Sequence, residues 1–121
     1  MFASDISAEA MAVAKKNAEC NKADVSFVIA DILREENPAG ESYDIIVSNP
    51  PYVREMEKVM MNRNVLDYEP HIALFVPDGD PLMFYRHIAE FASKHLRTGG
   101  KLYLEINEAL GNETAALLEK Q

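Results

Sequence analysis

The residues of this sequence that are best suited to chemistry form the tetrapeptide Asn49-Pro50-Pro51-Tyr52. Proline fixes its own φ and forces the preceding residue into an extended conformation, so this stretch has very little backbone freedom. Neither proline has an N–H group, which leaves the Asn49 side-chain oxygen and the neighbouring backbone carbonyls as hydrogen-bond acceptors. The ring of Tyr52 would form a wall beside them. The tetrapeptide therefore predicts a rigid cluster of acceptors.

A rigid cluster of acceptors suits a substrate that carries a planar NH2 group. Two fixed oxygens can accept both N–H bonds of an amide or an exocyclic amine, which holds the nitrogen in place and makes its lone pair more available to an electrophile. Such a reaction needs no basic side chain. The alternative is that the tetrapeptide is only a rigid exit from a strand, because asparagine and proline are common turn residues.

The element that must position this tetrapeptide is the apolar run Tyr43–Val47, which we expect to be a strand buried on both faces. Two earlier apolar runs of strand length end in an acid, Asp5 in one case and Asp31 in the other. Ligands bind outside the carboxyl ends of parallel strands, so we expect Asp5, Asp31 and Asn49 to lie at one edge of a sheet. The alternative for each single acid is a helix cap or a solvated turn.

Helices are expected to follow these strands. Ser7 can cap a helix that ends near Cys20, and Asp80-Pro81 predicts the N-cap and first position of another helix that Gly99-Gly100 would stop. The predicted apolar faces are Met11, Ala14 and Ala18 in the first helix and Tyr85, Ile88, Ala89, Ala92 and Leu96 in the second. Both faces have the spacing of an amphipathic helix.

The stretch between Tyr52 and Asp80 is long, mixed in charge and only weakly periodic, which predicts a lid or binding loop over residues 54–79. Its methionines could form one short helix face; they are Met56, Met60 and Met61. Alternation of Leu102, Leu104 and Ile106 predicts a last strand, followed by a helix over residues 108–121. Strands that alternate with helices predict an α/β fold with a parallel sheet and helices on both faces.

Composition places the 121 residues in one ordinary globular domain, with 48% hydrophobic and 26% charged residues. The formal net charge of -8 offers no general attraction to a phosphate backbone. Cys20 is the only cysteine, so no internal disulfide can form, which fits a reducing cytoplasm. No long apolar run is present, and the three histidines have no ligand-like spacing, so we expect neither membrane insertion nor a metal site.

Several segments together resemble one enzyme family. They are Ala3-Ser4-Asp5-Ile6-Ser7, Ala14 with Asn17-Ala18, Phe27–Asp31, Asp44–Val53, Tyr68-Glu69-Pro70, Ala73-Leu74, Asp78-Gly79, Phe84-Tyr85-Arg86, Gly99-Gly100 and Leu104-Glu105-Ile106. With them the chain resembles the S-adenosylmethionine-dependent methyltransferases, and most closely the peptide chain release factor glutamine methyltransferases. The tetrapeptide Asn49–Tyr52 is shared with amino-methyltransferases of nucleic acids, whereas Tyr68-Glu69-Pro70 favours the protein-glutamine branch.

The resemblance implies a Rossmann-like fold, S-adenosylmethionine as cofactor and a release factor as substrate. In the cofactor site, Asp5 would accept from the ribose hydroxyls and Asp31 from the adenine amine, with Ile32 against the ring. In the catalytic site, Asn49 and the Pro50 carbonyl would hold the substrate amide, with Pro51 and Tyr52 shaping the slot; Asn49 would also border the cofactor. The methyl group would pass directly from sulfur to the amide nitrogen, accelerated mainly by approximation and alignment.

The sequence also departs from this family. Its five glycines never occur as Gly-x-Gly, so the Gly-rich cofactor loop that would precede Met1 is absent. The N-terminal recognition helices and the last strands are missing too, and Phe75-Val76-Pro77 and Asn107 replace expected glycines. We therefore expect residues 1–121 to be an internal piece of the catalytic domain, inactive and a poor cofactor binder by itself. Exposed sheet edges at the missing strand would favour a homodimer.

Two other functions stay open on the sequence. An amino-methyltransferase acting on adenine in nucleic acid would use the same chemistry, although the acidic composition weighs against it. A noncatalytic interaction module, whose sheet edge pairs with another chain, would need no cofactor.

Overall fold

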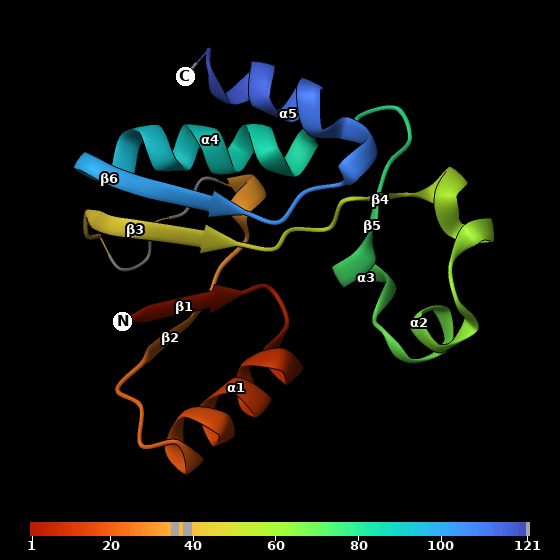
Figure 1. Cartoon of the computed structure of the whole chain (residues 1–121). Helices are drawn as coiled ribbons and strands as arrows, with labels where there is room; N and C mark the ends of the chain where they lie inside the picture. The colour runs from red at the N-terminus through yellow and green to blue at the C-terminus, as the bar shows by residue number, and fades with distance from the viewer. Residues whose placement is uncertain (35–36, 38–39, 121) are drawn as a thin grey trace. The chain divides into compact units, whose positions relative to one another are not determined.

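The computed structural model describes residues 1–34, 37 and 40–120. The chain divides into two compact units, Met1–Glu41 and Ser42–Gln121. Figure 1 shows the helices and strands of both units along the chain.

Unit 1 is a single strand–helix–strand motif followed by a short turn of helix. Its elements are β1 (Phe2–Asp5), α1 (Ala8–Cys20), β2 (Ser26–Ile29) and the 3-10 helix η1 (Ile32–Arg34). Strands β1 and β2 pair in parallel, with Phe2 opposite Ser26 and Asp5 opposite Ile29. Since α1 connects two parallel neighbours, both strands place their carboxyl ends at the same edge of the pair.

Helix α1 follows the sequence prediction closely. The Ser7 hydroxyl accepts a hydrogen bond from the Ala10 backbone N–H at 3.2 Å, which satisfies one of the free donors of the first turn. On the predicted apolar face Met11 is buried, and Ala14 and Ala18 are half-buried. The helix ends at Cys20, as expected.

Unit 2 contains two further parallel pairs of strands. Its elements are β3 (Tyr43–Ser48), β4 (Val53–Arg54), η2 (Glu55–Met60), α2 (Arg63–Tyr68), α3 (His71–Leu74), β5 (Phe75–Val76), α4 (Met83–His95), β6 (Leu96–Leu104), η3 (Glu108–Leu110) and α5 (Gly111–Leu118). Strand β3 pairs with β6, and β4 pairs with β5. Parallel pairing of all described strands confirms the predicted α/β class.

Strand β3 is not buried on both faces, so that prediction is wrong. The Ile45 and Val47 side chains are 59% and 74% exposed. Ile46, which points to the opposite face, is half-buried, and Figure 1 shows α4 lying along the β3–β6 pair. Burial is thus confined to one face of β3, and among the described strands only β6 pairs with it.

The stretch after Tyr52 is built of short regular elements, not of one long loop as predicted. Strands β4 and β5 bracket it, with Val53 opposite Phe75. The expected methionine face is also wrong, because Met56 and Met60 are 62% and 78% exposed. A two-residue strand carries no periodic signal, and its partner lies about twenty residues away, so local patterns could not reveal this arrangement.

Helix α4 confirms four of the five residues of the predicted apolar stripe but neither the predicted start nor Leu96, which is the first residue of β6. Tyr85, Ile88, Ala89 and Ala92 are all buried, and they form the largest part of the described core. The helix begins at Met83, and no side chain caps it. Asp80 instead accepts two hydrogen bonds from the Arg86 guanidinium, at 2.8 and 3.1 Å.

The predicted stop at Gly99-Gly100 is likewise replaced by a different structure. Helix α4 ends at His95, and the two glycines lie inside β6, where the register against β3 shifts between Tyr43 and Ile45. Gly99 has φ of +82°, a conformation that favours glycine. A Cβ atom on Gly100 would stand 2.9 Å from the Arg97 carbonyl oxygen and 3.0 Å from that of Asp44. Gly99 and Gly100 therefore allow the irregular backbone of β6 at this point.

Candidate active site at the carboxyl end of strand β3

The tetrapeptide Asn49–Tyr52 lies directly between the end of β3 and the start of β4. Asn49 is exposed, Pro50 is buried, and Pro51 and Tyr52 are half-buried. The described part of the chain offers the Asn49 side chain no hydrogen-bond partner. Its amide oxygen therefore remains able to accept from a ligand, as the sequence predicts.

The segment that follows β6 holds this tetrapeptide at both ends. At the entry, the Glu105 backbone N–H donates to the Ser48 carbonyl oxygen at 3.1 Å. At the exit, the Asn107 side-chain amide donates to the Tyr52 carbonyl oxygen at 3.0 Å. Because the prolines cannot donate, these two bonds from residues 105–107 supply the fixation that the tetrapeptide cannot provide for itself.

A third bond fixes the Tyr52 side chain. Its hydroxyl donates to Glu105 Oε1 at 2.6 Å. This hydrogen bond, helped by partial burial and by the negative charge of Glu105, raises the pKa of Tyr52 to about 12. The phenol is therefore neutral near pH 7, and its proton is committed to the Glu105 carboxylate rather than offered to a ligand.

Asn107 also joins the tetrapeptide to the start of η2. Its side-chain amide donates to Glu57 Oε2 at 2.9 Å, and the same oxygen accepts from the Arg54 backbone N–H at 2.8 Å. The Arg54 guanidinium donates to both Glu57 oxygens, which holds the pKa of the Glu57 carboxyl below its usual range. Glu57 is therefore ionised and can bind the backbone beyond Tyr52.

Tyr85 on helix α4 supports the same segment from inside. Its side chain is fully buried, and its hydroxyl accepts from the Asn107 backbone N–H at 3.2 Å and donates to the Glu105 carbonyl oxygen at 3.3 Å. Burial raises the pKa of Tyr85. The position of residues 105–107 is thus tied to the core of unit 2.

The predicted cofactor-binding acids are both in unit 1, at the edge where β1 and β2 end. Asp5 accepts from the Ser7 backbone N–H at 2.8 Å. Asp31 accepts from the Leu33 backbone N–H at 3.0 Å and pairs with Arg34 at 3.5 Å. These are the local turn contacts that the alternative interpretation expected.

The predicted cofactor roles of Asp5 and Asp31 require that their carboxylates can accept further hydrogen bonds beside these turn contacts. Each carboxylate oxygen can accept two hydrogen bonds, so the turn contacts do not exhaust either acid. Ile32, in η1, directly follows Asp31 and is half-buried. The structure brings Asp5 and Asp31 to one edge of the β1–β2 pair, whereas Asn49 to Tyr52 follow β3, which pairs with β6. The expectation that all three polar residues end strands of one sheet is therefore wrong for the described strands, because β1 and β3 belong to different two-stranded sheets.

Sequence reasoning missed the residues that hold the tetrapeptide. Glu105 directly follows an apolar strand, so the rule that selected Asp5 and Asp31 could have selected it too. Asn107 was noted only as a departure from an expected glycine. Glu57 and Tyr85 gave no such signal, because their contacts join residues far apart in the sequence.

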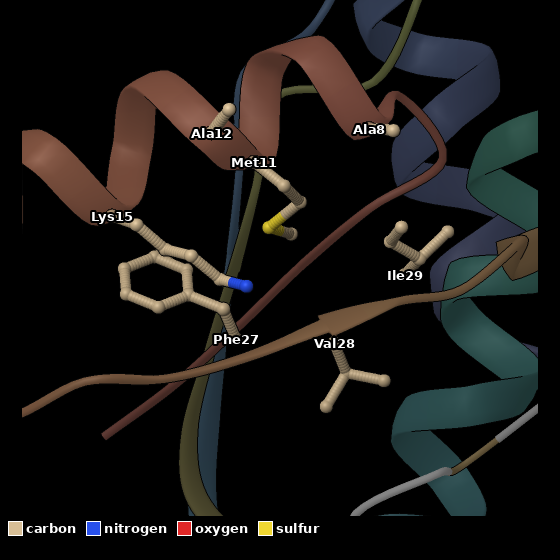
Figure 2. A pocket seen from close by; sticks show the side chains of 7 residues that line it. All are labelled: Ala8, Met11, Ala12, Lys15, Phe27, Val28 and Ile29. Carbon is tan, nitrogen blue, oxygen red and sulfur yellow. The ribbon is translucent and has the colours of Figure 1, made fainter.

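Figure 2 shows a small cavity in unit 1, between α1 and β2, into which the Met11 and Phe27 side chains point. It measures about 170 Å³, less than the roughly 300 Å³ at which small-molecule sites begin. Lys15 brings the only charged group in its lining. We regard this cavity as a gap between helix and strand.

Residues 1–34, 37 and 40–120 contain no group of three or more His, Cys, Asp or Glu residues placed to hold a metal ion. Within the same ranges, every helix is too short or too polar to cross a membrane.

These features define a class of protein before any comparison is made: a parallel α/β chain with a rigid acceptor loop at the end of a strand. The methyltransferase small domain family matches residues 1–68, which is more than half of the chain. The chain therefore belongs to the methyltransferase small domain family.

Individual relatives are similar over nearly the whole chain. A release factor glutamine methyltransferase of Flavobacterium psychrophilum is 53% identical over 120 residues, which cover 99% of this chain and 42% of the relative. One of Bacteroides thetaiotaomicron is 56% identical over 95% of this chain and 41% of the relative. A bifunctional methyltransferase of Rickettsia bellii is 43% identical over 86% of this chain and 18% of the relative. The chain thus spans less than half the length of these relatives.

Proposed function

We propose that the whole protein transfers a methyl group from S-adenosylmethionine to the side-chain amide nitrogen of a glutamine in peptide chain release factors, and that this chain carries its acceptor site. The observation that supports this most is the state of Asn49: exposed, without a partner among the described residues, and at the start of a loop fixed at both ends. Its amide oxygen and the Pro50 carbonyl are suited to accept both N–H bonds of a primary amide.

Residues of this chain then orient the amide and leave its nitrogen to react. A methyl group bound to a sulfonium is electrophilic, which is the chemistry that S-adenosylmethionine supplies when bound. Hydrogen bonds from the amide to Asn49 and Pro50 favour the positive charge that develops on the nitrogen, which becomes neutral again when one of its two protons passes to water. Tyr52 is neutral near pH 7 because its pKa is about 12, so it adds no charge of its own and serves as an aromatic wall.

The cofactor's adenosine part fits the acids of unit 1. Asp5 and Asp31 stand at the carboxyl ends of paired parallel strands, and each retains acceptor capacity beside its turn contacts. We assign Asp5 to the ribose hydroxyls, Asp31 to the adenine amine and Ile32 to the adenine ring. The parallel pairs of both units would be parts of a Rossmann-like catalytic domain with helices on both faces.

The relatives' names and the acidic composition favour a protein substrate over a nucleic acid. The lone cysteine, Cys20, is exposed and free, which suits the reducing cytoplasm where release factors act.

The decisive experiment incubates the full-length protein and labelled cofactor with a purified release factor, with the same factor lacking the glutamine of its Gly-Gly-Gln loop, or with duplex DNA. We expect label only in the unaltered factor. Label in DNA alone would favour an adenine amino-methyltransferase.

The role of Asn49 is tested by Asn49→Ala. We expect kcat to fall by about 10²–10³, the effect of losing one oriented hydrogen bond to a developing charge, with cofactor affinity nearly unchanged. Asn112→Ala is the matched control, because Asn112 is also exposed but lies on α5. Near-normal turnover of Asn49→Ala would refute the assigned role.

A further inference from the structure

We propose that Glu105 is a positioning residue of the acceptor site: its carboxylate holds the Tyr52 hydroxyl and thereby fixes the aromatic wall of the slot before substrate binds. This inference rests on the proposed function, since it concerns the same slot. It assigns a role to a residue outside the tetrapeptide, 53 positions away in the sequence.

The backbone of the slot is already fixed without the Glu105 side chain. The Ser48 and Tyr52 carbonyls accept from Glu105 N–H and the Asn107 side chain, at 3.1 and 3.0 Å. Just beyond, the Arg54 N–H donates to Glu57 at 2.8 Å. Backbone atoms on both sides of the two prolines therefore have partners in unit 2.

The Tyr52 side chain is held at its hydroxyl by Glu105. Tyr52 is only half-buried, so packing alone does not select one orientation of its ring. A tyrosine has two rotatable side-chain bonds, and fixing its hydroxyl restricts both of them. Among the described residues, the Tyr52 hydroxyl is bonded to Glu105 Oε1 alone, and at 2.6 Å this bond is short, as expected for an O–H bound to a carboxylate.

The backbone of Glu105 is well anchored, although its side chain is exposed. Its backbone N–H and carbonyl oxygen bind Ser48 and the buried Tyr85 hydroxyl. The carboxylate is thus presented from a fixed backbone, and replacing it removes no buried group. A loss of activity on its replacement would therefore report on the slot rather than on folding.

Positioning makes a specific prediction about variants of the full-length protein. Glu105→Ala and Tyr52→Phe each remove the same hydrogen bond, so each should lower kcat/KM for the release factor about tenfold, with cofactor affinity within twofold of wild type. The double variant should be no slower than Tyr52→Phe alone, because coupled residues do not add. Glu105→Gln keeps an oxygen acceptor and should recover most of the activity.

A second measurement follows the hydrogen bond without any turnover. In protein labelled at the tyrosine ζ-carbon, the Tyr52 resonance, assigned from its absence in Tyr52→Phe, should titrate near pH 12. In Glu105→Ala it should titrate closer to the ordinary value of 10. Glu108→Gln is the matched control for lost charge, since Glu108 is exposed and three positions further on, and should change neither the titration nor kcat/KM.

The outcomes separate this inference from the proposed function. If the wild-type protein methylates no release factor, the proposed function fails, while the Tyr52 titration still tests the hydrogen bond. Wild-type kcat/KM in Glu105→Ala would overturn the positioning role. Losses that multiply in the double variant would also overturn it. A Glu105→Gln variant as slow as Glu105→Ala would do the same, because activity would then require the charge of Glu105 and not the hydrogen bond.

Discussion

Substituting alanine for Gly100 tests how closely β6 approaches its surroundings. The added Cβ would lie 2.9 Å from the Arg97 carbonyl oxygen, 3.0 Å from the Asp44 carbonyl oxygen and 3.0 Å from Leu96 Cδ2. Two of these atoms belong to the backbone and cannot rotate away. Overpacking of this kind costs about 1–3 kcal/mol of the free energy of unfolding.

Urea denaturation followed by tyrosine fluorescence measures this cost. All tyrosines of the chain lie in unit 2, between positions 43 and 103, so their emission reports on the unit that contains Gly100. With a loss of about 2 kcal/mol and a denaturant slope of about 2 kcal/mol/M, the unfolding midpoint should fall by about 1 M urea.

Two other glycines give the controls. A Cβ on Gly79 would meet nothing within 4 Å, so Gly79→Ala should shift stability by less than about 0.5 kcal/mol. Gly99→Ala should also destabilise, by about 1–2 kcal/mol, but for a different reason: φ of +82° disfavours any side chain. Equal midpoints for Gly100→Ala and Gly79→Ala would refute the steric argument.

Two further predictions concern charge and assembly. The Arg86 guanidinium holds the pKa of Asp80 below its usual 3.8, so the ionised carboxylate stabilises the fold above that pH and this contribution is lost as the pH falls. Asp80→Asn should therefore weaken, without abolishing, the acid dependence of stability in urea titrations below about pH 5. At pH 7 it should cost less than about 1 kcal/mol, because the side chains of the pair are 42% and 44% exposed. The 121-residue chain should also self-associate through β3, whose Ile45 and Val47 side chains are exposed. Val47→Glu should prevent this self-association. A sedimentation coefficient that does not depend on protein concentration would contradict the prediction.

Features of the sequence that act over a few residues determined part of this structure. The Ser7 cap, the face of α1 and the stripe of α4 follow from helical spacing, which depends only on neighbours three and four positions away. The restricted backbone of the tetrapeptide follows from proline geometry and needs no other contact. The sequence alone therefore predicts a candidate site at the end of β3, and the structure places Asn49–Tyr52 directly after that strand.

The tertiary structure decided which residues complete the site. Burial of β3 on one face only, the pairing of β4 with β5, and the strand irregularity at Gly99-Gly100 all depend on which strands become neighbours. The bond from Tyr52 to Glu105 joins residues 53 positions apart. It exists because β3 and β6 run in parallel and end together, with Ser48 opposite Leu104, a register that no local pattern in either segment encodes.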